Sequence, residues 1–374
     1  MKKILLISFE YPKGNGYCGG VGQIVKQSRD VLQELGHEVY VLVAKEFLKK
    51  KPVRFLLPNG RFVVYPNLFS LERDYPWERF DCIIQHFVNW TGQLKRLRRS
   101  KGRRPKIIYH FHSILRREKD AGFKTFKKYL VNQERMIELA DQVICPSRYE
   151  FKHFNMYFPN FSRKVSLIEN TVEMYPFREK EVDRLKKLHR IDDKQDVISL
   201  YVGRLERMKG ADIIIDHLPD LMHRHKNLKM FIVGKSRKLS LYRKLQKIRT
   251  KFPQRLFYLK YVEKQQLFQY YYLSQIYVNT SLSESFSLST HEGALCNNAL
   301  LLNRLPVFDK FRNAALFFSA QEDNSDGLMT RFSQLIDNGR LRVNLAKKAS
   351  QLARHSTNKE YLRSNLSNIV GNHH

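Results

Sequence analysis

Short runs of apolar and β-branched residues recur along the chain, separated by segments in which apolar positions have helical spacing. Runs of this kind predict buried strands. In the first half of the chain they lie at 3–9, 38–44, 82–88, 106–112, 142–147 and 165–170. The second half repeats the scheme at 197–205, 228–234, 255–262, 276–281 and 298–303. Because continuous apolar strands that alternate with helices are typical of parallel sheets covered on both faces, the pattern predicts an α/β fold.

The two series of strands predict two doubly wound, Rossmann-like domains that face each other across a cleft. The stretch 173–196 is charged and has no strand-like run, so we expect the hinge there. The predicted N-terminal domain is 1–173 and the predicted C-terminal domain is 174–355. A helix is expected in 356–374, one option being that it packs back on the first domain. Since ligands of open α/β sheets bind beyond the carboxyl ends of the strands, the cleft is the expected active site.

Charge extends this picture, because the chain of 374 residues carries 67 Lys and Arg against 36 Asp and Glu, a net charge of +31. This excess is more than solubility requires. It indicates a polyanionic partner such as an acidic membrane face, an anionic polymer, a nucleotide-bearing substrate or nucleic acid. The four cysteines form no CxxC pair, so reduced thiols are expected rather than a zinc knuckle or a disulfide framework.

The opening apolar run ends at Glu10 and is shorter than the apolar region of a signal peptide, so we expect a first strand there. No run of about 18 apolar residues occurs in the sequence. Any membrane contact is therefore expected to be peripheral.

In YVGRLERMKGAD (201–212), Arg204 and Lys209 stand between the end of a predicted strand at Gly203 and the start of a predicted helix. Arg204, Lys209 and Gly210 lie where the amides of a helix N-terminus are unpaired, which suits a diphosphate. The other interpretation is a solvated basic turn.

A glycine-rich segment, GNGYCGGVGQ (14–23), follows the first predicted strand. No GK[ST] follows it, which excludes a Walker nucleotide site. Its backbone can approach an anionic or sugar ligand closely, or it can be merely a flexible loop. The glycines are Gly14, Gly16, Gly19, Gly20 and Gly22.

The stretch SLSESFSLSTHEG (281–293) carries two glutamates, Glu284 and Glu292, with no other acid between them. On their own they could be ordinary acids near a helix N-terminus, which the helix dipole favours.

Taken in order, several segments resemble a family 4 glycosyltransferase with the two-domain GT-B fold. They match its glycine-rich loop, its AD-x-V-I-x-x-S stretch, the V-I-P-N-G-V-D signature, the V-G-R-L…K-G turn and the E-x7-E signature. The segments are GGVG (19–22), ADQVICPSRYE (140–150), VSLIENTVEMYPF (165–177), YVGRLERMKG (201–210) and ESFSLSTHE (284–292). The resemblance covers most of the chain.

The resemblance implies roles for these residues. Glu284 would lie by the donor sugar and Glu292 would bind the ribose, while Arg204 and Lys209 would neutralise the diphosphate leaving group. The resemblance also implies that the donor contacts residues at the helix start and in the glycine loop. These are Phe286, Ser287 and Leu288 at the helix start, and Gly19 and Gly20 in the loop. The D-x-D motif of metal-dependent glycosyltransferases is absent from the sequence. Catalysis without a metal or other cofactor is therefore expected.

Histidines end two of the predicted strands. The resemblance places His112 against the donor sugar, with His110 two residues earlier on the same strand face. His86 ends another strand and is a candidate for the acceptor side. Each of the three can instead be a satisfied core histidine.

The sequence departs from the family pattern beside the expected donor site. Glu169 and Thr171 replace the proline and glycine of P-N-G-V, and Ser287 replaces the glycine after Phe286. The family's Gly-Thr-Pro turn is replaced by Asn297–Asn298–Ala299. These changes leave open the identity of the donor and a weakened or silent enzyme.

Two basic segments, 93–106 and 116–128, lie in the predicted acceptor-side domain, and Phe123 and Phe126 are interleaved in the second. They indicate an interface with anionic lipid, and a solvated basic face is the alternative. A third basic segment, 234–255, has apolar residues at helical spacing and predicts an amphipathic surface helix. No recognisable nucleic-acid module occurs, so a nucleic-acid partner is not expected.

The resemblance therefore implies a cytoplasmic enzyme, peripheral on the inner membrane face, that acts in polysaccharide biosynthesis. It would move a hexose from a nucleoside-diphosphate sugar, a UDP-sugar, with retention of configuration and without a metal. The acceptor would be a lipid-linked or anionic surface glycan. The alternative is a catalytically silent glycan- or membrane-binding subunit of the same fold. A phosphorylase would require a pyridoxal-binding lysine site, for which the sequence shows no signature.

Overall fold

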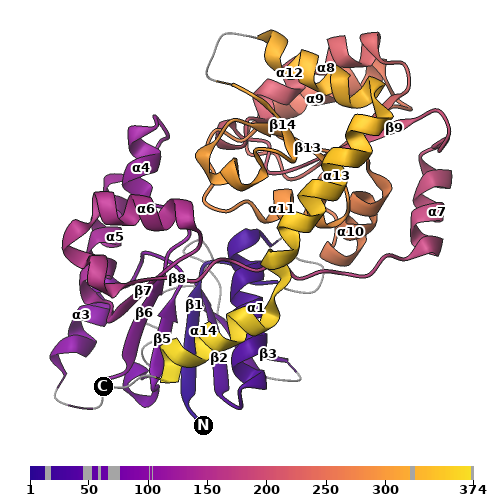
Figure 1. The fold of residues 1–374 in the computed structure, drawn as a ribbon. Helices are drawn as coiled ribbons and strands as arrows, with labels where there is room; N and C mark the ends of the chain where they lie inside the picture. Colours follow the sequence, from indigo (N-terminus) through magenta and orange to yellow (C-terminus); the bar gives the residue numbers. More distant parts are fainter. Residues whose placement is uncertain are drawn as a thin grey trace. The chain divides into compact units, whose positions relative to one another are not determined.

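The computed structural model describes residues 1–12, 18–44, 53–57, 60–65, 76–100, 102, 104–320 and 325–371. The chain forms two compact units (Figure 1). The first unit consists of Met1–Thr171 with Asn358–His374, and the second unit is Val172–Thr357. The division thus falls after residues 171 and 357, where the sequence suggested 173 and 355.

The first unit is built on an eight-stranded sheet in the order β3-β4-β2-β1-β5-β6-β7-β8. Its strands are β1 (Lys3–Ser8), β2 (Glu38–Ala44), β3 (Val53–Leu57), β4 (Gly60–Tyr65), β5 (Cys82–Gln85), β6 (Lys106–His110), β7 (Gln142–Cys145) and β8 (Val165–Leu167). Neighbouring strands are parallel except β3 and β4, which pair antiparallel. The expectation of parallel strands alone was therefore wrong at this edge. The available sequence signal was the Asn59–Gly60 dipeptide between two apolar runs, which favours a hairpin.

The second unit is built on a six-stranded parallel sheet in the order β11-β10-β9-β12-β13-β14. Its strands are β9 (Val197–Val202), β10 (Leu228–Val233), β11 (Leu256–Leu259), β12 (Ile276–Asn279), β13 (Ala299–Asn303) and β14 (Ala315–Phe318). The apolar pattern did not predict β14. The strand order is that of the Rossmann fold, so the predicted doubly wound architecture is confirmed.

Helices cover both faces of each sheet (Figure 1). The helices of the first unit are α1 (Gly20–Glu34), α3 (Thr91–Arg99), α4 (Leu115–Asp120), α5 (Lys127–Leu139), α6 (Arg148–Tyr157) and α14 (Lys359–Gly371). Those of the second unit are α7 (Glu179–Leu188), α8 (Ala211–Arg224), α9 (Leu239–Lys251), α10 (Lys264–Leu273), α11 (Leu288–Leu295), α12 (Ser325–Asp337) and α13 (Gly339–Ala353). The stretch 173–196, expected as a hinge, contains α7.

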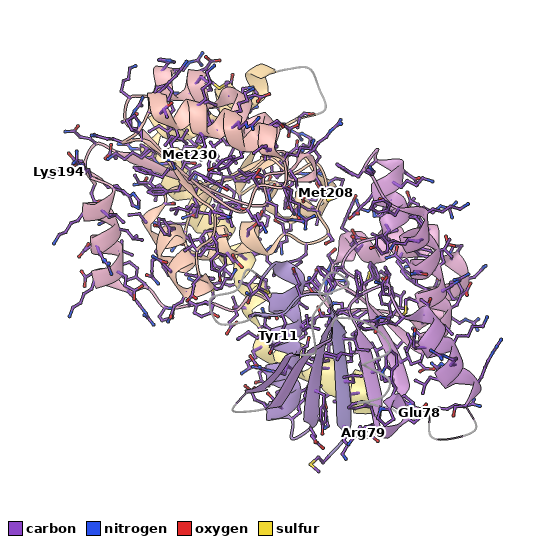
Figure 2. The ribbon with its side chains drawn as sticks, turned by 180° about the vertical axis from the view of Figure 1, so that it is seen from behind. Tyr11, Glu78, Arg79, Lys194, Met208 and Met230 are labelled. Carbon is purple, nitrogen blue, oxygen red and sulfur yellow. The ribbon has the colours of Figure 1, made fainter. Side chains whose placement is uncertain are left out.

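Each sheet separates two apolar clusters, as alternating strand residues require. In β9, Val197 and Tyr201 join one cluster, and Ile198 and Leu200 join the other. Met230 lies inside the second unit, whereas Lys194 is exposed on its surface (Figure 2). Both faces of the strands are therefore buried, which explains their continuous apolar runs.

The C-terminal helix α14 completes the first unit. Leu362 and Leu366 join the apolar cluster that contains Val25 and Leu32 of α1. The Lys2 Nζ atom donates a hydrogen bond of 2.6 Å to the carbonyl of Val370. The last segment of the chain is thus part of the core formed by the first strands.

Candidate functional site

In the second unit, the strand order reverses between β9 and β12, which lie side by side. The segments that follow both strands leave the same edge of the parallel sheet. Such a switch point is where doubly wound folds bind ligands. The two motifs that the sequence singled out, 201–212 and 281–293, are these segments.

The turn after β9 is fastened to the end of β12. The hydroxyl of Tyr201 donates to the carbonyl of Lys209 at 2.9 Å, and the Thr280 hydroxyl donates to the carbonyl of Gly210 at 2.7 Å. Gly210 has φ 58°, and a Cβ atom there would lie 1.8 Å from the Thr280 carbonyl oxygen. Glycine is therefore required at this position, and α8 begins directly after it at Ala211.

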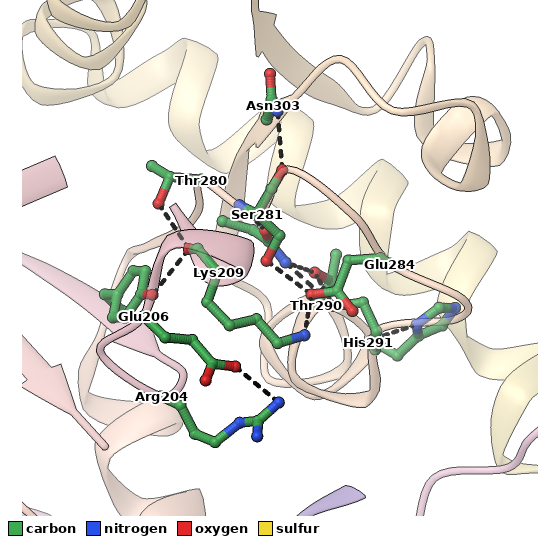
Figure 3. Close-up of polar contacts among 12 residues, drawn as sticks. Arg204, Glu206, Lys209, Thr280, Ser281, Glu284, Thr290, His291 and Asn303 are labelled. Carbon is green, nitrogen blue, oxygen red and sulfur yellow. Dashed lines mark hydrogen bonds and ion pairs between the residues drawn. The ribbon is translucent and has the colours of Figure 1, made fainter. Parts of the chain in front are cut away.

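Lys209 and Glu284, 75 residues apart, meet at this edge (Figure 3). The Lys209 Nζ atom lies 2.8 Å from Glu284 Oε1, which also accepts a hydrogen bond of 2.8 Å from the Ser281 hydroxyl. The Glu284 side chain is only 8% exposed. The two residues expected at the sugar and at the diphosphate thus share one small site.

Arg204 is also paired. Its guanidinium lies 2.8 Å from Glu206 Oε1 (Figure 3). The other oxygen of Glu206 lies 3.6 Å from the Arg237 guanidinium. Main-chain hydrogen bonds between 205 and 235–237 hold the two loops together. Each of the two cations expected at the diphosphate therefore has a carboxylate partner in this structure. Glu206 was missed, although it lies within the motif that the sequence singled out.

Glu292 is buried in α11, where it is 3% exposed and forms an ion pair with Lys264 at the start of α10. Burial and this carboxylate raise the pKa of the Tyr271 hydroxyl well above its usual value. Lys264 lies 28 residues from Glu292 in the chain, and no sequence signal links them. A buried carboxylate needs a compensating partner, which here is Lys264.

Helix α11 begins at Leu288, and not at Phe286 as expected. Ser287, which stands where the family has glycine, adopts φ 66° in the left-handed region. This conformation costs a non-glycine residue about 1–2 kcal/mol. The Ser287 hydroxyl accepts from Asn279 at 3.1 Å and contacts the Thr290 hydroxyl at 2.9 Å. These bonds compensate for the departure from glycine.

The ring of His291 stacks on Phe286, with centroids 4.1 Å apart and planes 5° apart. Its Nδ1 atom lies 2.9 Å from the Ser287 carbonyl oxygen. Burial is the main cause that holds the pKa of His291 well below its usual value, and the nearby Lys310 adds to it. His291 is thus a neutral packing partner of the turn that carries Phe286.

Asparagines build the turn where the family has Gly-Thr-Pro. Asn297 adopts φ 58°, which asparagine tolerates better than most residues. The Asn298 amide donates to the carbonyls of Tyr271 and Ser274, at 2.9 and 2.6 Å. The altered turn is therefore fastened to the end of α10.

In the first unit the strand order reverses between β1 and β5. Three histidine rings meet beside this point, where the His112 ring stacks on those of His86 and His110. His86 and His110 have ring centroids 4.9 Å apart, as do His110 and His112. The Nδ1 atom of His86 lies 3.1 Å from Nε2 of His112. Burial lowers the pKa of His110 to about 4. Burial also holds the pKa values of His86 and His112 well below the usual range, and for these two the repulsion between neighbouring imidazoles is a second cause. The stack is neutral at pH 7.

Only part of the predicted glycine loop lies in the described residues, because 14 and 16 fall outside them. Gly19 precedes α1 and Gly20 begins it. The Gly22 amide donates to Glu10 Oε1 at 3.0 Å, and a Cβ atom on Gly19 would lie 2.7 Å from the same oxygen. The absence of a side chain at Gly19 thus makes room for the Glu10 carboxylate within the first unit.

The basic segments lie partly on helices and partly on the loops beside them. α3 contains residues 93–99 of the first segment, of which 101 and 103 lie outside the described residues. In the segment 116–128, residues 116–120 lie in α4, residues 121–126 form the connection, and 127–128 begin α5. Helix α9 carries much of the third segment, with Leu245 and Ile248 buried. Across the part of the chain that the structure describes, no helix has the length and apolar content to span a bilayer. Within the same residues, no three His, Cys, Asp or Glu side chains group to hold a metal ion.

Two family models match the chain one after the other. Residues 18–174 match the model described as Glycosyltransferase Family 4. Residues 181–352 match the model described as Glycosyl transferases group 1. The first match lies almost wholly in the first unit and the second lies in the second unit.

Curated relatives show low identity over most of the chain. The chain is 22% identical over 315 residues to a subunit of phosphatidylinositol N-acetylglucosaminyltransferase from Arabidopsis thaliana, covering 79% of this chain and 65% of the relative. The Homo sapiens protein of the same name is 22% identical over 320 residues, covering 80% and 61%. The chain thus spans less than two thirds of the length of these two relatives. An uncharacterized glycosyltransferase of Methanocaldococcus jannaschii is 23% identical, covering 94% and 93%.

Solved structures share the fold across the chain. Sucrose-phosphate synthase from Thermosynechococcus elongatus superposes with a TM-score of 0.77 at 16% identity, covering 99% of this chain and 98% of that one. HepE of Anabaena, in complex with UDP and glucose, gives a TM-score of 0.74 at 17% identity, covering 99% and 100%. With the consecutive family matches, the strand order and the ordered motifs, these likenesses show that the chain belongs to the family 4 glycosyltransferases of GT-B fold.

Proposed function

We propose that this glycosyltransferase moves a hexose from a UDP-sugar that binds at the switch point of the second unit, with retention of configuration and without a metal. The observation that carries the proposal is the contact of Lys209 with Glu284, which lie 75 residues apart in the chain. Arg204 lies on the same turn as Lys209, and Glu292 lies in the helix α11 that follows Glu284. Two structural neighbours are described as complexes with UDP-glucose and with UDP and glucose, which supports a uridine donor.

The main requirement of the reaction is positive charge beside the leaving diphosphate. A nucleoside diphosphate leaves while positive charge builds at the anomeric carbon, so fixed positive groups at the diphosphate lower the barrier. Lys209 and Arg204 take this role, and the amides at the start of α8 add to it. Since both cations are paired with carboxylates in this structure, the diphosphate exchanges with Glu284 and Glu206 as it binds. Glu284 then accepts hydrogen bonds from the sugar, and Glu292 accepts them from the ribose.

The acceptor in this proposal is a lipid that carries a phosphate group, or an anionic glycan linked to a lipid. The names of two relatives describe transfer of N-acetylglucosamine to phosphatidylinositol. The net charge of +31 and the basic segments 93–106 and 116–128 support an enzyme that works against an anionic membrane face, on the cytoplasmic side.

A second candidate is a silent subunit of the same fold that binds glycan or membrane. The observation in its favour is the internal neutralisation of the diphosphate cations, above all the pair of Arg204 with Glu206. In this case the charged cluster would serve the stability of the second unit.

Calorimetry with UDP, ADP and GDP, with and without EDTA, tests the donor site. Binding of UDP that EDTA does not weaken supports the proposal. Slow release of UDP from a panel of UDP-sugars then separates an enzyme from a silent subunit, and the anomeric configuration of the product, read by NMR, tests retention. Failure of every activated sugar to bind would overturn the proposed function.

A further inference from the structure

Four aromatic rings of the first unit form a continuous row that the proposed donor chemistry does not use. The ring centroids of Phe9 and Phe87 lie 5.1 Å apart, those of Phe87 and Tyr129 lie 6.3 Å apart, and those of Tyr129 and Phe126 lie 6.0 Å apart. The residues come from three separate parts of the sequence. We call Phe9, Phe87, Tyr129 and Phe126 the aromatic row.

The row has two ends of different character. Phe9 follows β1 and Phe87 follows β5, so one end lies at the switch point of the first unit, where His86 precedes Phe87 in the chain. Phe126 immediately precedes α5 and belongs to the basic segment 116–128. The row therefore leads from a basic surface to the place where a doubly wound unit binds ligands.

The rings are not simply core. Phe126 is 59% exposed and Phe9 is 37% exposed, while Phe87 and Tyr129 are half-buried against the apolar cluster under the sheet. Large apolar side chains left accessible in a row, beside charged neighbours, are typical of interaction surfaces. The exposed faces of Phe126 and Phe9 are therefore accessible to a ligand.

Lysines flank the outer end of the row. The Nζ atom of Lys124 lies 5.9 Å from the ring centroid of Phe126, and the Nζ atom of Lys128 lies 4.8 Å from that of Tyr129. Both lysines are exposed. Cations beside accessible rings match an amphiphile that has an anionic headgroup and an apolar chain.

The ring planes argue for a lipid over a bare glycan. Successive rings are tilted by 48°, 53° and 77°, so they offer no common flat face on which sugars could stack one after another. An acyl or prenyl chain needs only continuous apolar contact, because the hydrophobic effect is not directional. The tilted row with its lysines therefore fits a hydrocarbon chain next to a phosphate.

We infer that the aromatic row is the binding surface for the lipid part of the acceptor, a lipid that carries a phosphate. Its chain lies along Phe126 and Tyr129, its phosphate pairs with Lys124 or Lys128, and its reacting end points toward the rings beside His86. The inference rests on the proposed transfer to a lipid acceptor and adds where that acceptor is held.

Vesicle co-sedimentation of the full chain tests the row, with phosphatidylcholine alone and with added phosphatidylinositol. Phe126→Ser removes the most exposed ring while supplying a favourable N-cap residue for α5, so folding should be kept. We expect it to weaken binding about fivefold at low and at high salt, because an apolar contact is lost. Lys128→Gln should weaken binding at low salt only, because salt screens exposed charges.

Matched controls come from the same unit. Met156→Ser removes an exposed apolar side chain from α6, and Lys152→Gln removes an exposed charge from the same helix. Equal effects of Phe126→Ser and Met156→Ser would overturn the inference. Loss of vesicle binding in the presence of a soluble oligosaccharide that lacks a lipid would also overturn it, since the row would then bind sugar. If Phe126→Ser fails to fold, Phe9→Ser against the same control decides the question.

The two proposals can fail separately. UDP binding to each variant is measured in parallel, and we expect it to equal that of the wild type. If the wild type binds lipid through the row but binds no nucleotide, the proposed function fails and the row stands as a lipid surface. If UDP binds and the row variants bind lipid like the wild type, only the inference about the row fails.

Discussion

The two units share a construction and differ in the chemistry at the same point of it. Each is a doubly wound sheet whose strand order reverses beside its first strand, β1 in one unit and β9 in the other. At the switch point of the second unit stand lysine, arginine and glutamate side chains joined in ion pairs. At that of the first unit stand stacked neutral histidines and aromatic rings.

This difference teaches what each unit can bind. Paired charges provide fixed cations for an anionic ligand, and the carboxylate that the ligand displaces needs new hydrogen-bond donors, because an uncompensated buried charge is costly. Neutral rings offer contact and weak hydrogen bonding to an uncharged or apolar group. The same topology thus supports a site for an anionic donor in one unit and a site for a less polar ligand in the other.

The largest expected effect comes from removing the cation nearest Glu284. Lys209→Gln should lower kcat by about 10²–10³-fold, because charge developing on the leaving group loses its fixed partner. Steady-state kinetics with a UDP-sugar measures it. Lys244→Gln is the control, since Lys244 pairs with Asp216 at 2.6 Å on the exposed surface of the same unit. Similar kcat values for the two variants would show that Lys209 does not stabilise the leaving group.

The neutral histidines of the first unit predict the next effect, on stability. The pKa of His110 is about 4 in the folded chain against 6.5 ordinarily, so below pH 6.5 the unfolded chain binds more protons. Stability should fall as pH falls from 6.5 toward 4, by up to about 3 kcal/mol for His110 alone. Denaturant midpoints of the wild type and of His110→Gln measure this fall, which should be smaller in the variant.

Two comparisons isolate this histidine term. Glu150 is buried, and its pKa is raised to about 7, so it acts in the opposite direction as pH falls. The difference between variant and wild type cancels that contribution. His223→Gln changes an exposed histidine and should leave the pH slope as it is. An unchanged slope in His110→Gln would contradict a neutral stack.

Glu292 should matter for the nucleotide more than for chemistry. Glu292→Gln is expected to weaken UDP binding by about 10- to 100-fold, the cost of losing hydrogen bonds to a charged group, and to leave Lys264 without its partner. Calorimetry measures it. Glu263→Gln, an exposed change one residue before Lys264, should bind UDP like the wild type. If Glu292→Gln binds UDP with the affinity of the wild type, the ribose does not bind at Glu292.

The smallest effect has the opposite sign. Glu206→Gln should bind UDP about fivefold more tightly, because the diphosphate no longer competes with this carboxylate for Arg204 and Arg237. Asp216→Asn removes one negative charge elsewhere on the unit and controls for net charge. Weaker binding in Glu206→Gln would show that the carboxylate positions Arg204 instead of opposing its ligand.

Much of the fold was predictable because both faces of its strands are buried. The apolar runs at 38–44, 228–234 and 298–303 match β2, β10 and β13 closely. The hairpin β3–β4 was missed because its sequence signal is a short Asn-Gly dipeptide and not a continuous apolar run. Strand β14 (Ala315–Phe318) was also missed, although its apolar run is as long as those of β5, β7, β11 and β12, which were predicted.

The residues of the candidate site could be named from the sequence only where a motif contained them. Glu284, Glu292, Arg204 and Lys209 lie in segments with a readable signature, and the structure brings Lys209 to Glu284. Lys264 could not be found in this way, because its partner lies 28 residues away and nothing in its own neighbourhood marks it.

The sequence by itself predicted most of the strands and helices in their order along the chain, and the residue types offered to a sugar nucleotide. The need for glycine at 210 came from the structure, where a Cβ atom would meet the Thr280 carbonyl oxygen. The tertiary structure alone decided which charges neutralise each other, that three histidines stack, and that Phe9, Phe87, Tyr129 and Phe126 form one row. The physical reason is the range of the forces involved. Backbone conformation and apolar periodicity act over a few neighbouring residues, whereas ion pairs and ring contacts require side chains that only the closed sheet brings within a few ångströms.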